Sequence, residues 1–255
     1  MRIAIGIEYD GTAYNGWQRQ RTGLGVQACL EDALSDVADE RIEVTCAGRT
    51  DTGVHASGQV GHFDTQSDRS ERGWLLGANS NLPDDVNVTW VKPVADDFHA
   101  RFSATARSYK YVILNRLVRS ALYRRRAWWV YQPLDHQRMH EAAQILAGEH
   151  DFSSFRAAGC QASGPVREVQ SISVRRDGDW IVLEVTANAF LQHMVRNITG
   201  TLVAIGSGEE EVDWITELLE QRDRTRGGVA APPHGLTLVR VDYPDEFAIP
   251  PPLWI

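Results

Sequence analysis

The alternation of strand-like and helix-like segments constrains the fold of this chain more than any other feature. In the first half, alternate apolar residues predict a strand over residues 2–9, and apolar residues at helical spacing predict a helix that begins near residue 26. A strand near 59–64, a helix around 71–79 and a strand over 86–94 complete this half. Residues 96–103 have the pattern of a linker.

The second half loosely repeats this order of elements, without a repeat of sequence. Asp177-Gly178 is a dipeptide that favours a tight hairpin turn, and it separates two predicted strands. The predicted elements are a strand over 105–114, a helix from residue 135, strands near 166–175 and 180–186, helices over 190–205 and 212–221, and a strand over 236–241. We therefore expect an α+β protein of two lobes, 1–103 and 104–255.

The composition is typical of a soluble globular protein, with 43% hydrophobic and 24% charged residues in 255. No apolar run approaches the ~18 residues of a membrane span, and the N-terminus enters a strand pattern without a signal peptide. Cys29, Cys46 and Cys160 lack metal-ligand spacing. They are expected to be reduced thiols in a cytoplasmic protein, with neither a disulfide framework nor a metal site.

The net charge of −8 argues against a polyanionic partner, but the distribution of charge argues for one. Acids gather at 84–85, 96–97 and 209–211. Residues 101–126 contain no acid and eight basic residues: Arg101, Arg107, Lys110, Arg116, Arg119, Arg124, Arg125 and Arg126. Such segregation creates a local positive field that attracts phosphates, although a solvated basic loop explains the charges equally well.

Residues 47–58, AGRTDTGVHASG, carry the most informative motif. A single carboxylate, Asp51, lies on a glycine-flanked turn, two residues after Arg49. This arrangement suits the presentation of an ionised carboxylate to a ligand. For a bare Asp-Thr-Gly the more common explanation is a β-turn in which Asp caps backbone N–H groups. Twelve residues of this composition are a stronger signal than the triplet alone.

Two further segments carry candidate site residues. In residues 107–111, alternation on a strand places Tyr109 and Tyr111 on one face with Arg107, a surface able to stack a base and contact a phosphate. Taken alone, alternating tyrosines on a strand favour ordinary core packing over a binding surface. In residues 192–197, a helical apolar stripe leaves Arg196 at an angle, and a cleft-lining Arg usually needs an acid partner, for which Asp51 is the candidate.

Two histidines near these motifs are weaker candidates. His193 is expected to be structural rather than a ligand. His55 lies four residues after Asp51 and could form a metal pair with it, but a third ligand is not apparent in the sequence.

The motifs together resemble the tRNA pseudouridine synthase A family over nearly the whole chain, from residue 3 to about 243. The segments that carry the resemblance are 8–12 (EYDGT), 16–20 (GWQRQ), 47–55, 97–107, 109–111 (YKY), 151–155 (DFSSF) and 193–197 (HMVRN). Thr52 departs from the family pattern, in which Ala is common after the Asp; both residues are small. The resemblance implies two lobes with mainly antiparallel, ferredoxin-like or RRM-like sheets that flank a central catalytic cleft.

The resemblance also implies roles for single residues. Asp51 is expected to be the catalytic nucleophile, Tyr109 to contact the target base, and Arg196 to pair with the catalytic carboxylate. Arg49 is expected to help hold the flipped nucleotide. The charge distribution and the strand face, rather than the resemblance, lead us to expect RNA contacts from Arg107, Lys110, Arg124, Arg125 and Arg126. The resemblance implies a homodimer.

The implied reaction is isomerisation of uridine to pseudouridine at positions 38, 39 and 40 in the anticodon stem-loop of tRNA. Nothing is oxidised and no group leaves, so no cofactor or metal is expected, consistent with a sequence that lacks Gly-x-Gly-x-x-Gly and Walker motifs. An aspartic protease is a poor alternative, because a second Asp-Thr/Ser-Gly triplet is missing and Arg49 opposes the shared proton of such a dyad. A non-catalytic RNA-binding module is the better alternative, but it gives no reason for Asp51.

Overall fold

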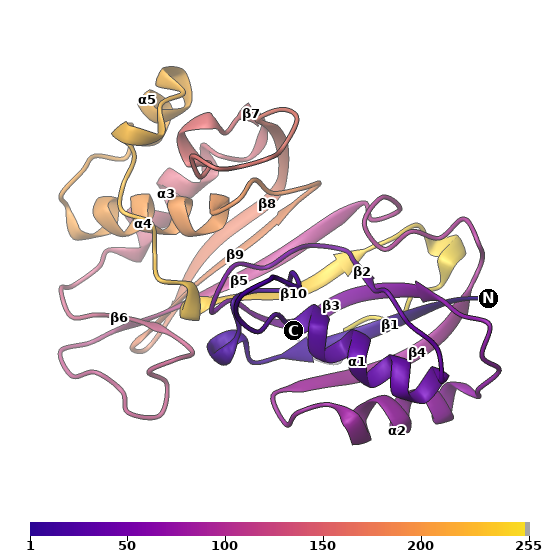
Figure 1. The fold of residues 1–255 in the computed structure, drawn as a ribbon. Helices are drawn as coiled ribbons and strands as arrows, with labels where there is room; N and C mark the ends of the chain where they lie inside the picture. The colour runs from indigo at the N-terminus through magenta and orange to yellow at the C-terminus, as the bar shows by residue number, and fades with distance from the viewer. Residues whose placement is uncertain (253–255) are drawn as a thin grey trace. The chain divides into compact units, whose positions relative to one another are not determined.

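The computed structural model describes residues 1–252 (Figure 1). Strand β1 (Arg2–Tyr9) lies between two other strands in the sheet of the N-terminal part of the chain. Ile3, Ala4 and Ile5 are all fully buried, so both faces of this strand are covered. It pairs antiparallel with β3 (His55–Asp64) and with β4 (Val86–Val94). The short β2 (Thr45–Cys46) pairs antiparallel with β3, and β10 (Leu236–Asp242) pairs parallel with it. The strand order is β4-β1-β3-β10.

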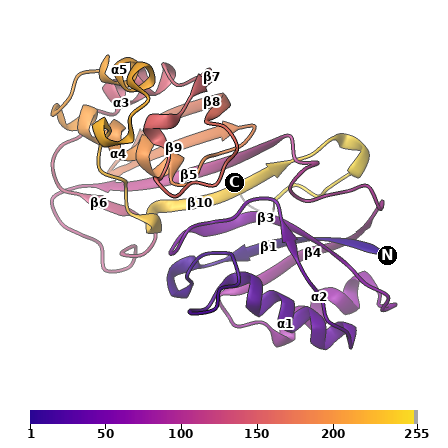
Figure 2. The same ribbon diagram turned by 45° about the horizontal axis from the view of Figure 1, so that its top comes forward.

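Helices α1 (Val26–Ala38) and α2 (Glu71–Asn81) lie side by side on one face of this sheet (Figure 2). A Cβ atom on Gly77 would lie 2.8 Å from Val37, so the two helices approach closely at this glycine. The chain runs from β3 through α2 to β4 and leaves β1 between the two strands, which is the split β-α-β arrangement of ferredoxin-like folds.

The chain divides into two units, and their first boundary lies four residues later than that of the predicted lobes. The first unit comprises Met1–Arg107 and the C-terminal segment from Thr237, and the second comprises Ser108–Leu236. The sequence prediction placed the whole C-terminal segment in the second lobe. The parallel pairing of Thr237 with His55 explains the difference, because a strand pattern does not reveal which sheet the strand joins.

The second unit contains a sheet of order β5-β9-β8-β7. Its strands are β5 (Ala106–Asn115), β7 (Gly148–Asp151), β8 (Val166–Asp177) and β9 (Trp180–Ala187), and β6 (Trp128–Val130) pairs parallel with β5. The predicted hairpin at Asp177-Gly178 is confirmed: β8 and β9 pair antiparallel through Asp177↔Trp180, and Gly178 has a φ of +55°. The side chains of Ser108 and Thr186 hydrogen-bond at 2.8 Å across β5 and β9.

Helices α3 (His136–Gln144), α4 (Met194–Ser207) and α5 (Trp214–Gln221) belong to this unit. The side chain of Asp135 accepts hydrogen bonds from the backbone N–H groups of Gln137 and Arg138, so it caps α3 where the sequence predicts the helix to begin. Helix α4 begins later than the predicted residue 190. His193, directly before it, has a left-handed φ of +63°, which the helical pattern of apolar residues does not reveal.

The observed fold is α+β with mainly antiparallel pairing, as predicted. Strands β6 and β7 were not predicted, because each has at most four residues and no clear alternation. None of the helices within residues 1–252 is long and apolar enough to cross a membrane. Short 3-10 helices are η1 (Gly11–Ala13), η2 (Ser153–Phe155), η3 (Arg224–Arg226), η4 (Pro233–Gly235) and η5 (Asp245–Phe247).

Candidate active-site residues

Asp51 lies in the first unit, on the loop that joins β2 to β3, and its side chain is half-buried. The preceding residue, Thr50, is 7% exposed, and its hydroxyl lies 2.8 Å from the hydroxyl of Tyr9 on β1. The backbone N–H of Trp17 donates to the carbonyl of Thr50 at 3.0 Å, and the N–H of Val54 donates to the carbonyl of Asp51 at 3.1 Å. The loop is therefore fixed on both sides of the carboxylate.

Gly16 and Gly53 make this loop conformation possible. Gly53 has a φ of +77° and donates its N–H to the carbonyl of Tyr14 at 3.3 Å. Gly16 has a φ of +90°, and a Cβ atom there would lie 2.6 Å from the carbonyl oxygen of Thr50. A residue with a side chain at Gly16 would be strained and would push against the backbone beside Asp51.

Gln59 and His55 support the same loop from β3. Gln59 is fully buried; its amide donates to the carbonyl of Gly48 at 2.6 Å and accepts from the N–H of Gly48. His55 is 2% exposed, and its Nδ1 accepts a hydrogen bond from the N–H of Gly11 at 3.1 Å. The sequence prediction missed Gln59, because nothing in its spacing connects it with Gly48. Arg49, by contrast, is exposed on the same loop.

Tyr109 lies in the second unit on β5 and is 8% exposed. Its ring packs edge to face against Phe190, with centroids 5.0 Å apart. Tyr111, two residues along the same face, is fully buried and donates its hydroxyl to the carbonyl of Pro232 at 2.7 Å. Burial raises the pKa of Tyr111, and the charge of Arg196 partly opposes that rise. Tyr111 is thus a core residue, while Tyr109 lies closer to the surface of the same strand.

Arg196 is in the first turn of α4 and is half-buried. Its Nε donates to the carbonyl of Ala231 at 2.8 Å, and the N–H of Ala231 donates to the backbone carbonyl of Arg196 at 3.0 Å. The segment around Ala231 packs against α4 without space between them: a Cβ atom on Gly200 would lie 1.8 Å from the carbonyl oxygen of Val229. The side chain of Arg196 is therefore held in a fixed direction, as a positioned cationic group requires.

The predicted RNA-contacting residues differ in their surroundings. Arg107 is 9% exposed and donates to the carbonyls of Ala47, Ala104 and Arg101, and its expected RNA contact stays a prediction. The Nζ of Lys110 lies 3.1 Å from Glu184 Oε1. The basic segment between β5 and β6 has exposed side chains at Arg116, Arg119, Arg124, Arg125 and Arg126, and the last three are the predicted RNA contacts.

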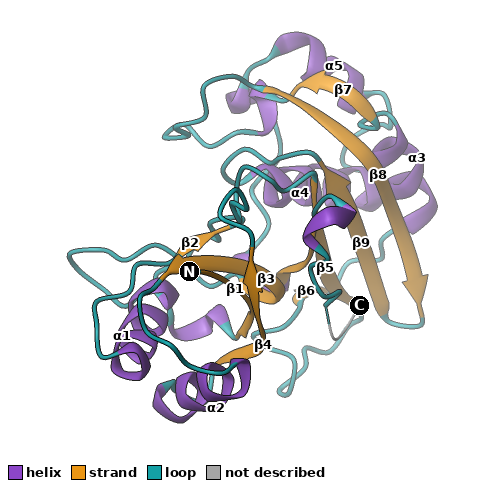
Figure 3. Cartoon of the chain, turned by 90° about the vertical axis from the view of Figure 1, so that its right-hand side faces the viewer, coloured by secondary structure: helices purple, strands orange, loops and turns teal. Residues whose placement is uncertain are grey.

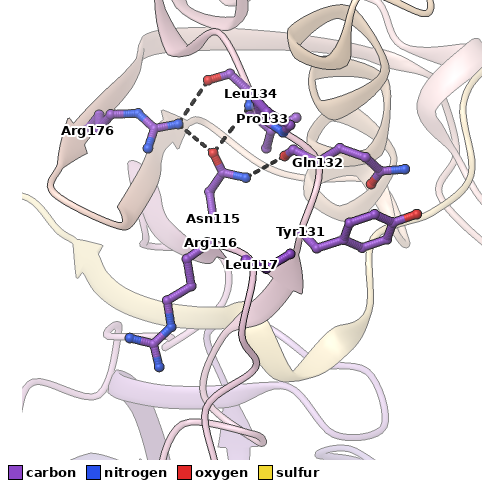
Figure 4. A pocket seen from close by; sticks show the side chains of 8 residues that line it. All are labelled: Asn115, Arg116, Leu117, Tyr131, Gln132, Pro133, Leu134 and Arg176. Carbon is purple, nitrogen blue, oxygen red and sulfur yellow. Dashed lines mark hydrogen bonds between the residues drawn. The ribbon is translucent and has the colours of Figure 1, made fainter.

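A pocket of about 630 Å³ lies in the second unit, beside the start of the basic segment (Figure 4). In its wall, the guanidinium of Arg176 donates to Asn115 Oδ1 at 2.6 Å and to the carbonyl of Leu134 at 2.9 Å. Arg116 and Tyr131 also line it, with side chains directed away from this network. Neither Tyr109 nor Arg196 lines this pocket, so it is separate from the predicted catalytic residues.

Within residues 1–252, no group of three or more His, Cys, Asp or Glu side chains is arranged to hold a metal ion. Cys29, Cys46 and Cys160 are free thiols. Burial raises the pKa of the Cys46 thiol to about 12, so this residue is an inert part of the core.

Known proteins match this chain in sequence over most of its length. The family model described as tRNA pseudouridine synthase matches residues 5–103 and 142–244. A tRNA pseudouridine synthase A from Pseudoalteromonas atlantica is 58% identical over 250 residues, which cover 98% of this chain and 95% of the relative. The enzymes of the same name from Methylococcus capsulatus and Coxiella burnetii are 57% and 55% identical, over 98% of this chain and 92% and 95% of theirs.

A solved structure, a Cbf5-Nop10-Gar1 complex, is more distant. Its sequence identity is 11% and its TM-score 0.38, with 92% of this chain and 48% of that chain covered. The sequence relatives carry the assignment, and they identify the protein as an isomerase. The chain belongs to the tRNA pseudouridine synthase family.

Proposed function

We propose that this enzyme converts uridine to pseudouridine at positions 38, 39 and 40 of the tRNA anticodon stem-loop, with Asp51 as the catalytic carboxylate. The observation that carries the proposal is the construction of the Asp51 loop. Buried groups on β1 and β3 fix the loop, and two positive-φ glycines shape it, yet Asp51 itself stays half-buried. A preorganised carboxylate of this kind suits chemistry on a bound ligand better than simple turn capping.

The reaction breaks the N1–C1′ bond, turns the uracil and forms a C5–C1′ bond. The C5 proton is lost and a proton is gained at N1, so the atoms balance without an oxidant or a leaving group. Asp51 supplies the carboxylate that starts bond cleavage, in the manner of covalent catalysis by Asp and Glu. Chemistry on a stacked base also requires its extrusion, which costs about a few kcal/mol, and exposed Arg49 beside Asp51 is the residue we assign to holding the flipped nucleotide.

We assign base contact to Tyr109 and charge stabilisation to Arg196. The Tyr109 ring is held edge to face by Phe190 on a rigid strand, so it presents one defined orientation to a uracil. The Arg196 guanidinium is oriented through its Nε bond to Ala231. The predicted ion pair between Arg196 and Asp51 stays a prediction. A double-mutant cycle on turnover tests it, because residues that act as a unit give strongly non-additive losses.

Recognition of the tRNA is assigned to the exposed arginines of the basic segment, Arg124, Arg125 and Arg126. Phosphate contacts of this type supply most sequence-independent affinity. Lys110, whose ammonium group lies next to Glu184, is a weaker candidate than these three.

The free thiols are consistent with a reducing, cytoplasmic compartment, and the resemblance further implies a homodimer.

The proposed target site is tested by mapping pseudouridine in tRNA from cells with and without the gene. The expected result is loss of the modification at positions 38–40 and its retention elsewhere, with recovery on expression of the wild-type chain. Unchanged modification at these three positions would refute the assigned site. A non-catalytic RNA-binding module predicts no change in pseudouridine anywhere.

A further inference from the structure

Two arginines, one at each end of the loop that follows η2 and precedes β8, hydrogen-bond to carbonyls of that loop and have no carboxylate partner. Arg156 directly follows η2, and Arg167 is the second residue of β8; the segment between them is loop (Figure 3). Both side chains are half-buried. Across the described part of the chain, neither guanidinium forms an ion pair with Asp or Glu. Arginines in this state are unusual, because buried or half-buried charges are normally paired.

The hydrogen bonds of the two side chains leave their charge uncompensated. Arg156 Nη2 donates to the carbonyl of Cys160 at 2.9 Å. Arg167 Nη1 donates to the carbonyls of Gly164 at 3.1 Å and of Val166 at 2.5 Å. The Nε of Arg167 is buried and, among residues 1–252, has no acceptor. The carbonyls orient both guanidinium forks but carry no net negative charge.

The nearest acids along the chain are engaged elsewhere or point away. Asp151 Oδ2 lies 3.5 Å from Arg222 Nε, and Asp151 Oδ1 accepts from the N–H of Ser153. Glu168 follows Arg167 on β8 and therefore lies on the opposite face of the strand. Burial lowers the pKa of Arg167, the nearby Cys160 thiol partly opposes that shift, and the charge of Arg156 adds to it. The two guanidiniums repel each other, and a bound anion would relieve that repulsion.

The position of this pair connects it with α4. The N–H of Ala157 donates to the carbonyl of Gln192 at 2.9 Å, directly before the helix. The carbonyl of Phe155 accepts from Asn197 Nδ2 at 2.7 Å, one residue after Arg196. Residues 155–157 therefore lie along the start of α4, where they contact Gln192 and Asn197, which precede and follow Arg196 in the sequence.

We propose that Arg156 and Arg167 together bind one backbone phosphate of the tRNA substrate, next to the nucleotide that Arg196 engages. The inference rests on the proposed function and adds residues that position the substrate. Planar guanidinium forks match the geometry of phosphate oxygens, and two of them on one phosphate compensate its charge. Neither residue carries a signal in the sequence beyond its charge, because the pair forms only when the loop folds back along α4.

The test is tRNA binding as a function of salt, measured in an Asp51→Asn background so that turnover does not intervene. Arg156→Gln, Arg167→Gln and the double variant are compared with Arg175→Gln. Arg175 lies on the same strand β8 but is exposed and paired with Glu184 at 2.6 Å, so it is a matched control. The probe is a full-length tRNA transcript with uridine at positions 38–40.

The double variant is expected to bind about tenfold more weakly at moderate salt, and its slope of log K against log salt to fall by about 0.7–0.9, the value for one phosphate. Each single variant should lose no more slope than the double, since both residues hold the same phosphate. Arg167→Lys keeps the charge and should keep the slope while losing affinity. The lysine variant also provides the test if Arg167→Gln does not fold.

Affinity and slope equal to those of the Arg175→Gln control would overturn the inference, and so would a loss of affinity with an unchanged slope in the double variant. Failure of the proposed function is distinguishable from either result. In that case the protein with Asp51 intact would bind tRNA but form no pseudouridine at positions 38–40.

Discussion

Replacing Gly16 by alanine should damage both the stability of the first unit and catalysis. Gly16 has a φ of +90°, which costs an alanine about 1–2 kcal/mol. The added Cβ would lie 2.6 Å from the Thr50 carbonyl oxygen and 3.0 Å from the Asp51 carbonyl carbon. Both neighbours are backbone atoms that cannot rotate away, so the loop that carries Asp51 has to shift by several tenths of an ångström.

A total destabilisation of about 2–4 kcal/mol follows, the sum of strain and displacement. Because a misplacement of about 1 Å can cost about 10²-fold in rate, turnover should fall by about 10- to 100-fold. Gly208→Ala is the matched control. Its φ of +80° imposes similar strain, but no atom lies within 4 Å of the added Cβ, so only about 1–2 kcal/mol and no rate should be lost.

The free energy of unfolding is measured by urea denaturation of each variant, and turnover by pseudouridine formed in a tRNA transcript at a temperature where both variants are folded. Gly16→Ala should lose more stability than Gly208→Ala, and it alone should lose activity. Equal destabilisation with full activity in Gly16→Ala would show that the loop does not depend on close approach at this glycine.

Three further predictions concern other parts of the chain. Tyr109→Phe should fold and bind tRNA normally, and its turnover should fall by about 10²-fold if the hydroxyl transfers a proton. Tyr109→Ala should lose activity in either case, and an active alanine variant would remove Tyr109 from the site. Replacing Arg124, Arg125 and Arg126 together by Gln should weaken tRNA binding and flatten its salt dependence, and an unchanged salt slope would return this segment to a solvated loop. His62 is buried and accepts the N–H of Ala100, and burial lowers its pKa to about 4. As pH drops, the unfolded chain therefore binds a proton at His62 before the folded chain does. The free energy of unfolding should fall between about pH 6.5 and about pH 4, by at most about 2 kcal/mol between pH 7 and pH 5. His62→Asn should show a smaller pH dependence of stability, and an equal one would exclude His62 as its cause.

The sequence patterns predicted the local elements well where apolar periodicity decides the structure. Strands β1 and β4 have the predicted bounds, and α1 begins at the predicted Val26. These elements are fixed by which faces must be buried, and that information is local. Helix α4 shows the limit: its start depends on the left-handed backbone of His193, which no periodicity encodes.

Long-range partners were less accessible to prediction. The C-terminal strand pairs with β3, which precedes it by many residues, and an alternating pattern does not specify such a partner. Arg107 was expected to contact RNA because it shares a face with two tyrosines. Its burial and its bonds to carbonyls such as that of Ala47 depend on how the loop before β5 folds back.

The residues of the candidate site divide in the same way. Asp51 could be predicted from the sequence because glycines and Arg49 mark its turn and because the surrounding motif resembles a known family. The groups that hold this turn were not found: Tyr9 and Gln59 are ordinary strand residues until the fold places them beside Thr50 and Gly48. The candidate catalytic residue can thus be predicted from a sequence motif, whereas the residues that hold it in place can be identified only from the tertiary structure.

We propose that Asp51 supplies the chemistry of the reaction and that other residues supply the tRNA binding. The most direct test compares wild-type protein with Asp51→Asn, in which the carboxylate becomes an amide of nearly the same shape, and measures tRNA affinity and pseudouridine formation on the same transcript. We expect nearly unchanged tRNA affinity, since Arg side chains provide most of it, and no pseudouridine above that of a mock preparation. Measurable turnover by Asp51→Asn, above that of the mock, would contradict the role assigned to this residue.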